Sequence, residues 1–323
     1  MTANLTERLG TDRLARRYMD VRDLLPDVDN PTPLVRVNHV ASAIDLYLKL
    51  EWLNPFGSVK DRTAAYLLED LKRADRLAGR ELVEASSGNT AIALAALAAL
   101  EGTRLTVTIP DGVPEEKKLI LRMLGAEVWS TPDDLCPVDL PKDGAIALAR
   151  SLAASGERYV MPDQYDNPEN VRAHYETTGP EIWRQTEGGV RTFIAGFGTC
   201  GTISGVGRYL KEQDPGVRIV AVEPQKGHRL PGLKSFAEAK EPAILDRTVI
   251  DDVITVEDEP AYATTLRLWR EDALMVGPST GALVHAANVI APEGVTVAIS
   301  PDSGTKYTSY FAGLLGDEGL PRI

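Results

Sequence analysis

The chain has 323 residues, 43% of them hydrophobic and 25% charged, which is typical of a globular protein with room for two lobes. Its formal net charge of -12 argues against nucleic acid or an anionic membrane as a partner, because like charges repel. The two cysteines, Cys136 and Cys200, are too few for a disulfide framework or a zinc site and fit a reducing cytosol. No segment has the length of a membrane span, and the four histidines lack metal-binding spacing. We therefore expect a cytoplasmic protein that binds no metal.

Short runs with β-strand character alternate with helical stretches, which predicts an α/β fold with parallel sheets. In the first half, strands are expected at 46–51, 81–85, 105–109 and 127–130, and helices at 90–100, 115–124 and 144–154; residues 159–161 end this compact unit. In the second half, helices are expected at 168–186, 202–211 and after 282, and strands at 192–196, 217–223 and 295–300. The first 30 or so residues are polar, and we expect them to form an arm on the surface or at a subunit contact.

A lysine stands between a turn and a predicted helix. Lys60 follows the segment 54–59, which reads Asn-Pro-Phe-Gly-Ser-Val, and precedes the helical run that starts at Thr63. A lysine held there out of bulk water can have a lowered pKa and form a Schiff base with an aldehyde cofactor. The alternative is an ordinary surface lysine, since most lysines are exposed.

Three junctions between a loop and a helix are rich in small polar residues. The segment 198–202 (Gly-Thr-Cys-Gly-Thr) offers converging backbone N–H groups at a helix N-terminus, which is the arrangement that binds phosphate. The segment 86–90 (Ser-Ser-Gly-Asn-Thr) offers hydroxyl, amide and backbone donors for a carboxylate. The segment 277–282 is a third such junction. Each could instead be a tight turn or a helix cap.

The phosphate junction also matches a dinucleotide-binding pattern. Residues 196–201 read Gly-Phe-Gly-Thr-Cys-Gly after a strand, and Glu223 ends the next strand. This reading predicts an NAD-dependent Rossmann oxidoreductase, but it leaves Lys60, the 86–90 segment and Ser279 without a role. We keep it as a distant alternative.

Together these segments resemble the fold-type II pyridoxal-phosphate enzymes of the cysteine synthase (O-acetylserine sulfhydrylase) and cystathionine β-synthase family. The resemblance rests on 54–62, 86–90, 164–168, 174–183, 198–202 and Ser279, and it extends from about residue 30 to about residue 311. The loop that begins at Gln225 resembles the B-type O-acetylserine sulfhydrylases more than the A-type.

The resemblance implies a role for each motif. Lys60 would be the catalytic residue that forms the Schiff base, Asn89 would contact the ring hydroxyl of the cofactor, and Ser279 would contact the pyridine nitrogen. The cofactor's phosphate would be held by Gly198, Thr199, Cys200, Gly201 and Thr202. The substrate carboxylate would be held by Ser86, Ser87, Asn89, Thr90 and Gln164.

The resemblance also implies a fold and an activity. We expect two three-layer α/β lobes similar to tryptophan synthase β, with pyridoxal 5'-phosphate in the cleft between them. Residues 1–56 and 167–323 would form the larger lobe and 57–166 the smaller, movable one, in a homodimer. The reaction would be a β-replacement that makes L-cysteine from O-acetyl-L-serine and sulfide through an aminoacrylate intermediate. The hydroxyl of Ser279 would make the ring a weaker electron sink, which favours replacement over transamination.

Several departures keep alternatives open. Phe56 stands where many relatives carry threonine and could narrow the pocket, and Cys200 stands where glycine is common, with its side chain expected to point away. His228, Arg229 and Lys234 could bind a phosphorylated leaving group, which would make O-phosphoserine the donor, or they could belong to a solvated loop. A cystathionine β-synthase activity is a further alternative. Serine/threonine dehydratases resemble the sequence less, and a catalytically silent binding protein is disfavoured because Lys60 is present.

Overall fold

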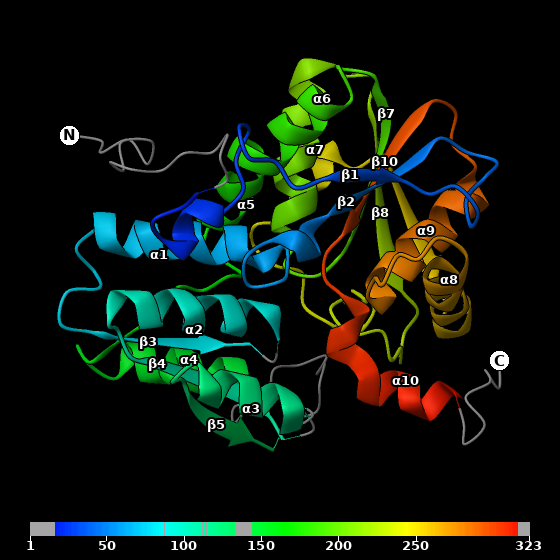
Figure 1. Cartoon of the computed structure of the whole chain (residues 1–323). Coiled ribbons are helices and arrows are strands. Elements are labelled where there is room, and N and C mark those ends of the chain that lie inside the picture. The colour runs from blue at the N-terminus through cyan, green and yellow to red at the C-terminus, as the bar shows by residue number, and fades with distance from the viewer. Residues whose placement is uncertain (1–16, 87, 112, 114, 133–143, 316–323) are drawn as a thin grey trace.

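The computed structural model describes residues 17–86, 88–111, 113, 115–132 and 144–315. The chain forms one four-stranded and one six-stranded sheet, each with helices packed on it, and the predicted α/β fold is confirmed (Figure 1). Ser87, Cys136 and most of the predicted N-terminal arm lie outside the described residues. In the described part of the chain, no helix combines the length and apolar character that a membrane-spanning helix needs.

The four-stranded sheet has the order β5-β4-β3-β6, and all its pairs are parallel. Its strands are β3 (Glu81–Ala85), β4 (Leu105–Pro110), β5 (Glu127–Thr131) and β6 (Tyr159–Val160). The helices around it are α1 (Lys60–Arg73), α2 (Asn89–Glu101), α3 (Glu115–Met123) and α4 (Ala145–Ala154). The Ala- and Leu-rich α2 is buried along most of its length, as expected for a helix that is apolar nearly all round.

The six-stranded sheet has the order β1-β2-β10-β7-β8-β9. Its strands are β1 (Leu34–Arg36), β2 (Leu46–Leu50), β7 (Val190–Gly196), β8 (Arg218–Pro224), β9 (Asp252–Val256) and β10 (Val295–Ser300). The pairs are parallel except at one edge, where β1 runs antiparallel to β2. The helices are α5 (Glu169–Ala173), α6 (Gly179–Gln185), α7 (Gly201–Gln213), α8 (Asp258–Glu271), α9 (Pro278–Ile290) and α10 (Thr308–Leu315).

The single helix predicted at 168–186 is divided into three parts. Between α5 and α6, residues His174–Thr178 form a π-helical turn. Pro180 has no N–H, so the carbonyl group one turn before it cannot be paired in a regular α-helix. In the same turn, the Thr177 hydroxyl donates to the Ala173 carbonyl at 2.5 Å, so this carbonyl has a hydrogen-bond partner. π-Helical turns of this kind are frequent at functional sites.

Four elements were not predicted from the sequence: β1, β9, α8 and α10. The strand β9 alternates between exposed and partly buried side chains up to its buried last residue, so its hydrophobic signal is weak. Its position at the edge of the sheet explains this pattern.

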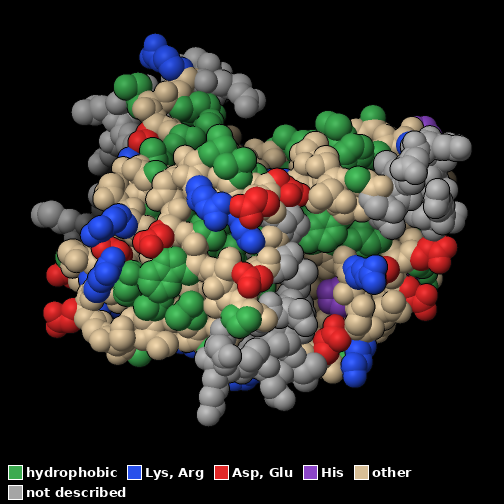
Figure 2. Space-filling model, turned by 90° about the horizontal axis from the view of Figure 1, so that it is seen from below, with side chains coloured by type: hydrophobic (Ala, Val, Ile, Leu, Met, Phe, Trp, Pro, Cys, Tyr) green, Lys and Arg blue, Asp and Glu red, His purple; other side chains and the backbone are tan. Residues whose placement is uncertain are grey.

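The carboxyl ends of β3, β7 and β10 lead into Ser86, Phe197 and Pro301, close to the loops singled out from the sequence. Ligands of parallel α/β sheets bind at such ends. On the face seen in Figure 2, acidic side chains are interspersed with basic ones, so the negative net charge forms no continuous acidic patch there.

Candidate active site

Lys60 is the first residue of α1, and the turn before it is fixed to the end of β10. The Val59 N–H donates to the Pro301 carbonyl at 2.8 Å, and Ser58 forms an antiparallel bridge with Asp302. From this position the Lys60 ammonium reaches the hydroxyl of Thr199, with Nζ 3.4 Å from Oγ1. The structure therefore brings the predicted Schiff-base lysine to the predicted phosphate loop, although 139 positions separate them.

The environment of Lys60 favours its neutral form. Burial lowers the pKa of Lys60 to about 8, while the nearby Cys200 and Asp302 act in the opposite direction. A lysine with this pKa has a substantial neutral, nucleophilic fraction near neutral pH. This is the property that a Schiff-base lysine needs.

Asp61 shapes the turn that carries Lys60. Its carboxylate accepts hydrogen bonds from the Phe56 N–H at 2.6 Å and from the Ser58 hydroxyl at 3.2 Å. Burial raises the pKa of Asp61 to about 7, although both hydrogen bonds favour its charged form. The Phe56 side chain packs against the apolar core of the four-stranded sheet, which gives it a structural role.

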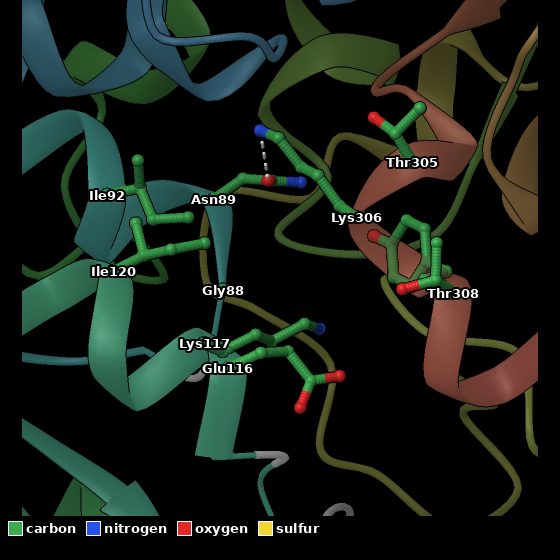
Figure 3. Close-up of a pocket in the computed structure, with 10 residues that line it drawn as sticks. Gly88, Asn89, Ile92, Glu116, Lys117, Ile120, Thr305, Lys306 and Thr308 are labelled. Atoms are coloured by element: carbon green, nitrogen blue, oxygen red, sulfur yellow. Dashed lines mark hydrogen bonds between the residues drawn. The ribbon is translucent and has the colours of Figure 1, made fainter.

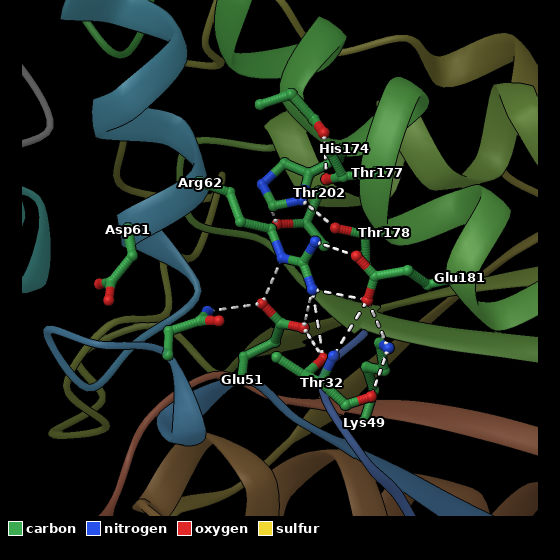
Figure 4. Close-up of polar contacts among 12 residues, drawn as sticks. Thr32, Lys49, Glu51, Asp61, Arg62, His174, Thr177, Thr178, Glu181 and Thr202 are labelled. Carbon is green, nitrogen blue, oxygen red and sulfur yellow. Dashed lines mark hydrogen bonds and ion pairs between the residues drawn. The ribbon is translucent and has the colours of Figure 1, made fainter. Parts of the chain in front are cut away.

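A buried ion cluster anchors the first turn of α1 to the six-stranded sheet (Figure 4). Arg62 donates to Glu51 at 2.7 and 2.9 Å and to Glu181 at 2.8 Å. Lys49, on β2, also pairs with Glu181 at 2.6 Å. Burial would raise the pKa of Glu51, but Arg62 and Lys49 outweigh it and lower this pKa to about 2. The cluster fixes the direction in which α1 presents Lys60.

The predicted phosphate loop opens α7 with an unusual backbone. Cys200 adopts a left-handed conformation with φ of 68°, which turns successive N–H groups toward one side. At Gly201, a Cβ would lie only 2.0 Å from the Asn170 Oδ1, so no larger residue fits there. The Asn170 amide donates to Thr199 Oγ1 at 3.0 Å and holds the loop in place. Among the described residues, no side chain caps α7, and its N-terminal N–H groups remain suited to an anion.

The Thr202 hydroxyl contacts a buried histidine, His174. His174 Nε2 lies 3.2 Å from Thr202 Oγ1, and its Nδ1 lies 2.9 Å from Thr178 Oγ1 (Figure 4). Burial lowers the pKa of His174 to about 3, and Lys60 and Arg62 add to this effect. The ring is therefore neutral at physiological pH and orients Thr202 without adding charge.

Cys200 packs into the core of the six-stranded sheet and is 3% exposed. Burial raises the pKa of its thiol to about 12. A thiol with this pKa is not a nucleophile near neutral pH.

The predicted carboxylate loop and Gln164 lie together. The Thr90 hydroxyl donates to Gln164 Oε1 at 2.6 Å, and Gln164 Nε2 donates to the Ala85 carbonyl at 3.3 Å. Ser86 Oγ accepts from the Ala91 N–H at 3.2 Å, so this hydroxyl also caps the start of α2. Ser87 lies outside the described residues.

Asn89 and the loop that precedes Ser279 both contact Asp302, just after the end of β10. Asn89 Nδ2 donates to Asp302 Oδ2 at 2.6 Å, and the N–H of Gly277 donates to the Asp302 carbonyl at 3.0 Å. Ser279, in the first turn of α9, is 5% exposed. Asp302 thus connects the turn that carries Lys60, the start of α2 and the start of α9.

Four residues of this site received no role from the sequence: Asn170, His174, Asp302 and Lys306. His174 lies in one of the segments that carry the family resemblance, and Asp302 follows the strand predicted at 295–300. Their partners are distant in sequence, so no local pattern could reveal the contacts.

Comparison with known proteins assigns the family. The chain matches the family described as pyridoxal-phosphate dependent enzymes over residues 25–302. It belongs to that family. Cysteine synthase of Aquifex aeolicus is 40% identical over 90% of this chain and 92% of its own length. Cysteine synthase B of Escherichia coli is 39% identical over 89% of this chain and 94% of its own length. The crystal structure of an O-ureido-L-serine synthase superposes with a TM-score of 0.82 at 35% identity, covering 91% of this chain and 94% of that one.

The residues present fit the cofactor of this family. Pyridoxal phosphate needs an amine for its aldehyde and donors for its phosphate. Lys60 supplies a partly desolvated amine, and the α7 N-terminus supplies N–H groups beside Thr199. The Rossmann alternative is wrong, because the family match covers the same GxGxxG segment and the fold as a whole.

Proposed function

We propose that this protein makes L-cysteine from O-acetyl-L-serine and sulfide with pyridoxal 5'-phosphate. The observation that carries the proposal is the placement of a lysine with a pKa of about 8 against Thr199 of the glycine-rich loop. The relatives named cysteine synthase and cysteine synthase B, which are similar over most of the chain, support the choice of reaction.

The residues of this chain would divide the work. Lys60 Nζ would bind the cofactor's aldehyde, and Gly198, Thr199, Cys200, Gly201 and Thr202 its phosphate. When bound, the cofactor supplies a conjugated ring that accepts the electrons released as the substrate loses its Cα proton. Once the substrate's amino group has taken its place on the aldehyde, Lys60 Nζ would be free to take up this proton and later return it, which its lowered pKa permits.

The remaining residues orient the reacting groups. We propose that Ser86, Ser87, Asn89, Thr90 and Gln164 bind the substrate carboxylate near the N-terminus of α2. Asn89 would also contact the cofactor's ring oxygen, and Ser279 its ring nitrogen. At Cβ of the substrate, acetate departs and sulfide is added. Exclusion of water between these steps would protect the reaction from hydrolysis.

The assembly is part of the same proposal. Residues 57–166, which include all four strands of the smaller sheet, would form the movable lobe, and residues 1–56 and 167–323 the larger one. We propose a homodimer, which sedimentation of the purified protein tests directly. The cytoplasmic location remains a prediction from the composition.

The activity is tested by cysteine formation. Purified protein loaded with pyridoxal phosphate is given O-acetyl-L-serine and sulfide, and L-cysteine is measured by acid ninhydrin. We expect cysteine to form with the native protein and with Lys240→Ala, which removes an exposed lysine, but not with Lys60→Ala. A protein that binds the cofactor and makes no cysteine would contradict the proposal. Cystathionine formation from serine and homocysteine would then favour the cystathionine β-synthase alternative.

One observation supports O-phosphoserine as a second candidate donor. The Lys234 ammonium lies 5.3 Å from the centre of the Tyr165 ring. Tyr165 directly follows Gln164 in the sequence. The backbone N–H of Lys234 donates to the Phe197 carbonyl at 2.8 Å, and Phe197 directly precedes the predicted phosphate loop. Arg229 is exposed, and burial lowers the pKa of His228, which favours the neutral form of its ring.

The two donors are distinguished by kcat/KM. If O-phosphoserine is used, Lys234→Met should lower kcat/KM for it about tenfold and leave O-acetylserine nearly unchanged. An equal effect on both donors, or no turnover of O-phosphoserine by the native protein, would exclude this candidate.

A further inference from the structure

Asn89 stands between two opposite charges. Its Nδ2 donates to Asp302 Oδ2 at 2.6 Å, and its Oδ1 accepts from Lys306 Nζ at 3.0 Å (Figure 3 shows the second bond). Asn89 and Lys306 line a pocket of about 180 Å³ between α2, α3 and the segment 305–308. The two partners come from the end of β10 and the turn that follows it, while Asn89 begins α2.

The two charged partners permit only one orientation of the amide. An amide side chain presents an acceptor and a donor of nearly equal shape, and nothing local distinguishes its two orientations. Here a reversed amide would place its N–H groups against the ammonium and its oxygen against the carboxylate. Two charge-assisted hydrogen bonds would be lost and replaced by repulsion.

Both partners are themselves fixed. Lys306 Nζ also donates to the Gly57 carbonyl at 2.9 Å and to the Phe56 carbonyl at 3.4 Å, so each of its three N–H groups has an acceptor. Burial lowers the pKa of Lys306, while Asp302 and Asp61 favour its charged form. Gly57 has φ of 82°, and a Cβ there would approach the Lys306 Nζ to 3.2 Å. A glycine therefore leaves the space that the ammonium occupies.

Asp302 is equally constrained. It is 2% exposed, and its Oδ2 also accepts a hydrogen bond from the Tyr307 hydroxyl. Its Oδ1 is buried and has no hydrogen-bond partner among the described residues. The carboxylate therefore has little freedom to turn away from Asn89.

We propose that Lys306 and Asp302 are positioning residues that hold the Asn89 amide so that one of its N–H groups donates to Asp302 and the other is available as a donor to the cofactor's ring oxygen. This inference rests on the proposed function, since it needs Asn89 to contact the cofactor. Lys306 also connects Asn89 to the Phe56-Gly57 turn that precedes Lys60.

The test is a double-mutant cycle on cofactor affinity. Pyridoxal phosphate is titrated into the cofactor-free full-length protein and its Kd is measured from the visible absorption band. The variants are Lys306→Met, Asn89→Ala, the two combined, and the surface control Lys240→Met. We expect Lys306→Met to weaken binding about tenfold, Asn89→Ala by a similar factor, and the combination no more than Asn89→Ala alone. Lys240→Met should bind as the native protein does.

Three results separate the possibilities. Equal affinity of Lys306→Met and the native protein, or a full multiplicative loss in the double variant, would overturn the role of Lys306 through Asn89. A native protein that binds no pyridoxal phosphate would instead overturn the proposed function. Lys306→Arg keeps the charge and should recover most of the affinity, and circular dichroism of each cofactor-free variant shows whether it is folded. If Lys306→Met does not fold and Lys306→Arg binds as weakly as Asn89→Ala, the inference is wrong.

Discussion

Lys49 is buried and Lys60 is partly buried, and the two lysines differ in their partners. Lys49 is 0% exposed and has three acceptors, the Glu181 carboxylate at 2.6 Å, the Thr32 carbonyl at 2.7 Å and Gln185 Oε1 at 2.7 Å. Among the described residues, the Lys60 ammonium has one side-chain hydrogen bond, a 3.4 Å contact with the Thr199 hydroxyl, and no carboxylate within ion-pair distance. Burial lowers the pKa of both.

The difference in hydrogen-bond partners indicates a structural role for Lys49 and a chemical role for Lys60. A buried cation with all its acceptors in place holds segments together and has no reason to react. A desolvated lysine without a counter-ion is destabilised in its charged form and is therefore ready to lose a proton and attack a carbonyl. The buried ion cluster that contains Lys49 stabilises the start of α1, whereas Lys60 on the same helix has no carboxylate partner among the described residues.

The largest effect is expected on activity. Lys60→Ala should lower kcat/KM for cysteine formation by at least about a thousandfold, because both the amine and the proton acceptor are lost. Lys49→Met should mainly lower stability, with the loss of activity following the loss of folded protein. Activity normalised to folded protein distinguishes the two variants. A Lys60→Ala enzyme of near-native activity would show that Lys60 does not have the chemical role assigned to it.

The second effect is expected on stability. Glu181→Gln removes the charge that Lys49 and Arg62 share and leaves two buried cations with one carboxylate, Glu51. The free energy of unfolding in urea should fall by about 3–5 kcal/mol. Glu293→Gln, at an exposed position, is the control and should change it by less than about 0.5 kcal/mol. Equal values for both variants would show that the cluster is not structural.

The third effect has the opposite sign. The charged form of Lys60 is destabilised in the folded state, whose pKa of about 8 lies below the ordinary value of 10.5. This cost is full below pH 8 and disappears as the pH rises toward 10.5. Lys60→Met should therefore stabilise the cofactor-free protein at pH 7, by on the order of 1 kcal/mol, and less at pH 10. Thermal unfolding at the two pH values measures this, and a less stable variant at pH 7 would contradict it.

The smallest effect concerns the carboxyl beneath the lysine turn. Burial raises the folded pKa of Asp61 from 3.8 to about 7, so the folded state binds the proton more tightly. Its contribution to stability is therefore present below pH 4 and is lost as the pH rises through 7. Asp61→Asn, which keeps the shape, should make stability vary less with pH between 4 and 7, by on the order of 1 kcal/mol. An unchanged slope in that range would show that Asp61 is not the titrating group.

Local patterns determined much of this protein. The strand β3 lies at 81–85 as expected, and α2 begins at Asn89, one residue before the expected 90, because short apolar runs and Ala- and Leu-rich stretches carry their own conformational signal. The turn before Lys60 and the loop at 198–202 were also predictable, since glycines and small polar residues mark backbone that must turn sharply or approach a ligand.

Only the tertiary structure decided which residues support these motifs. The side chain of Asn170 hydrogen-bonds to Thr199, and that of His174 to Thr202. Lys306 hydrogen-bonds to Asn89, although 217 positions separate them in the sequence. Such contacts depend on which strand ends meet at one edge of a sheet, and side-chain periodicity along the chain carries no information about that. The sequence alone therefore determined which residues are suited to the chemistry, while the packing of two sheets decided their pKa values, their orientation and their partners.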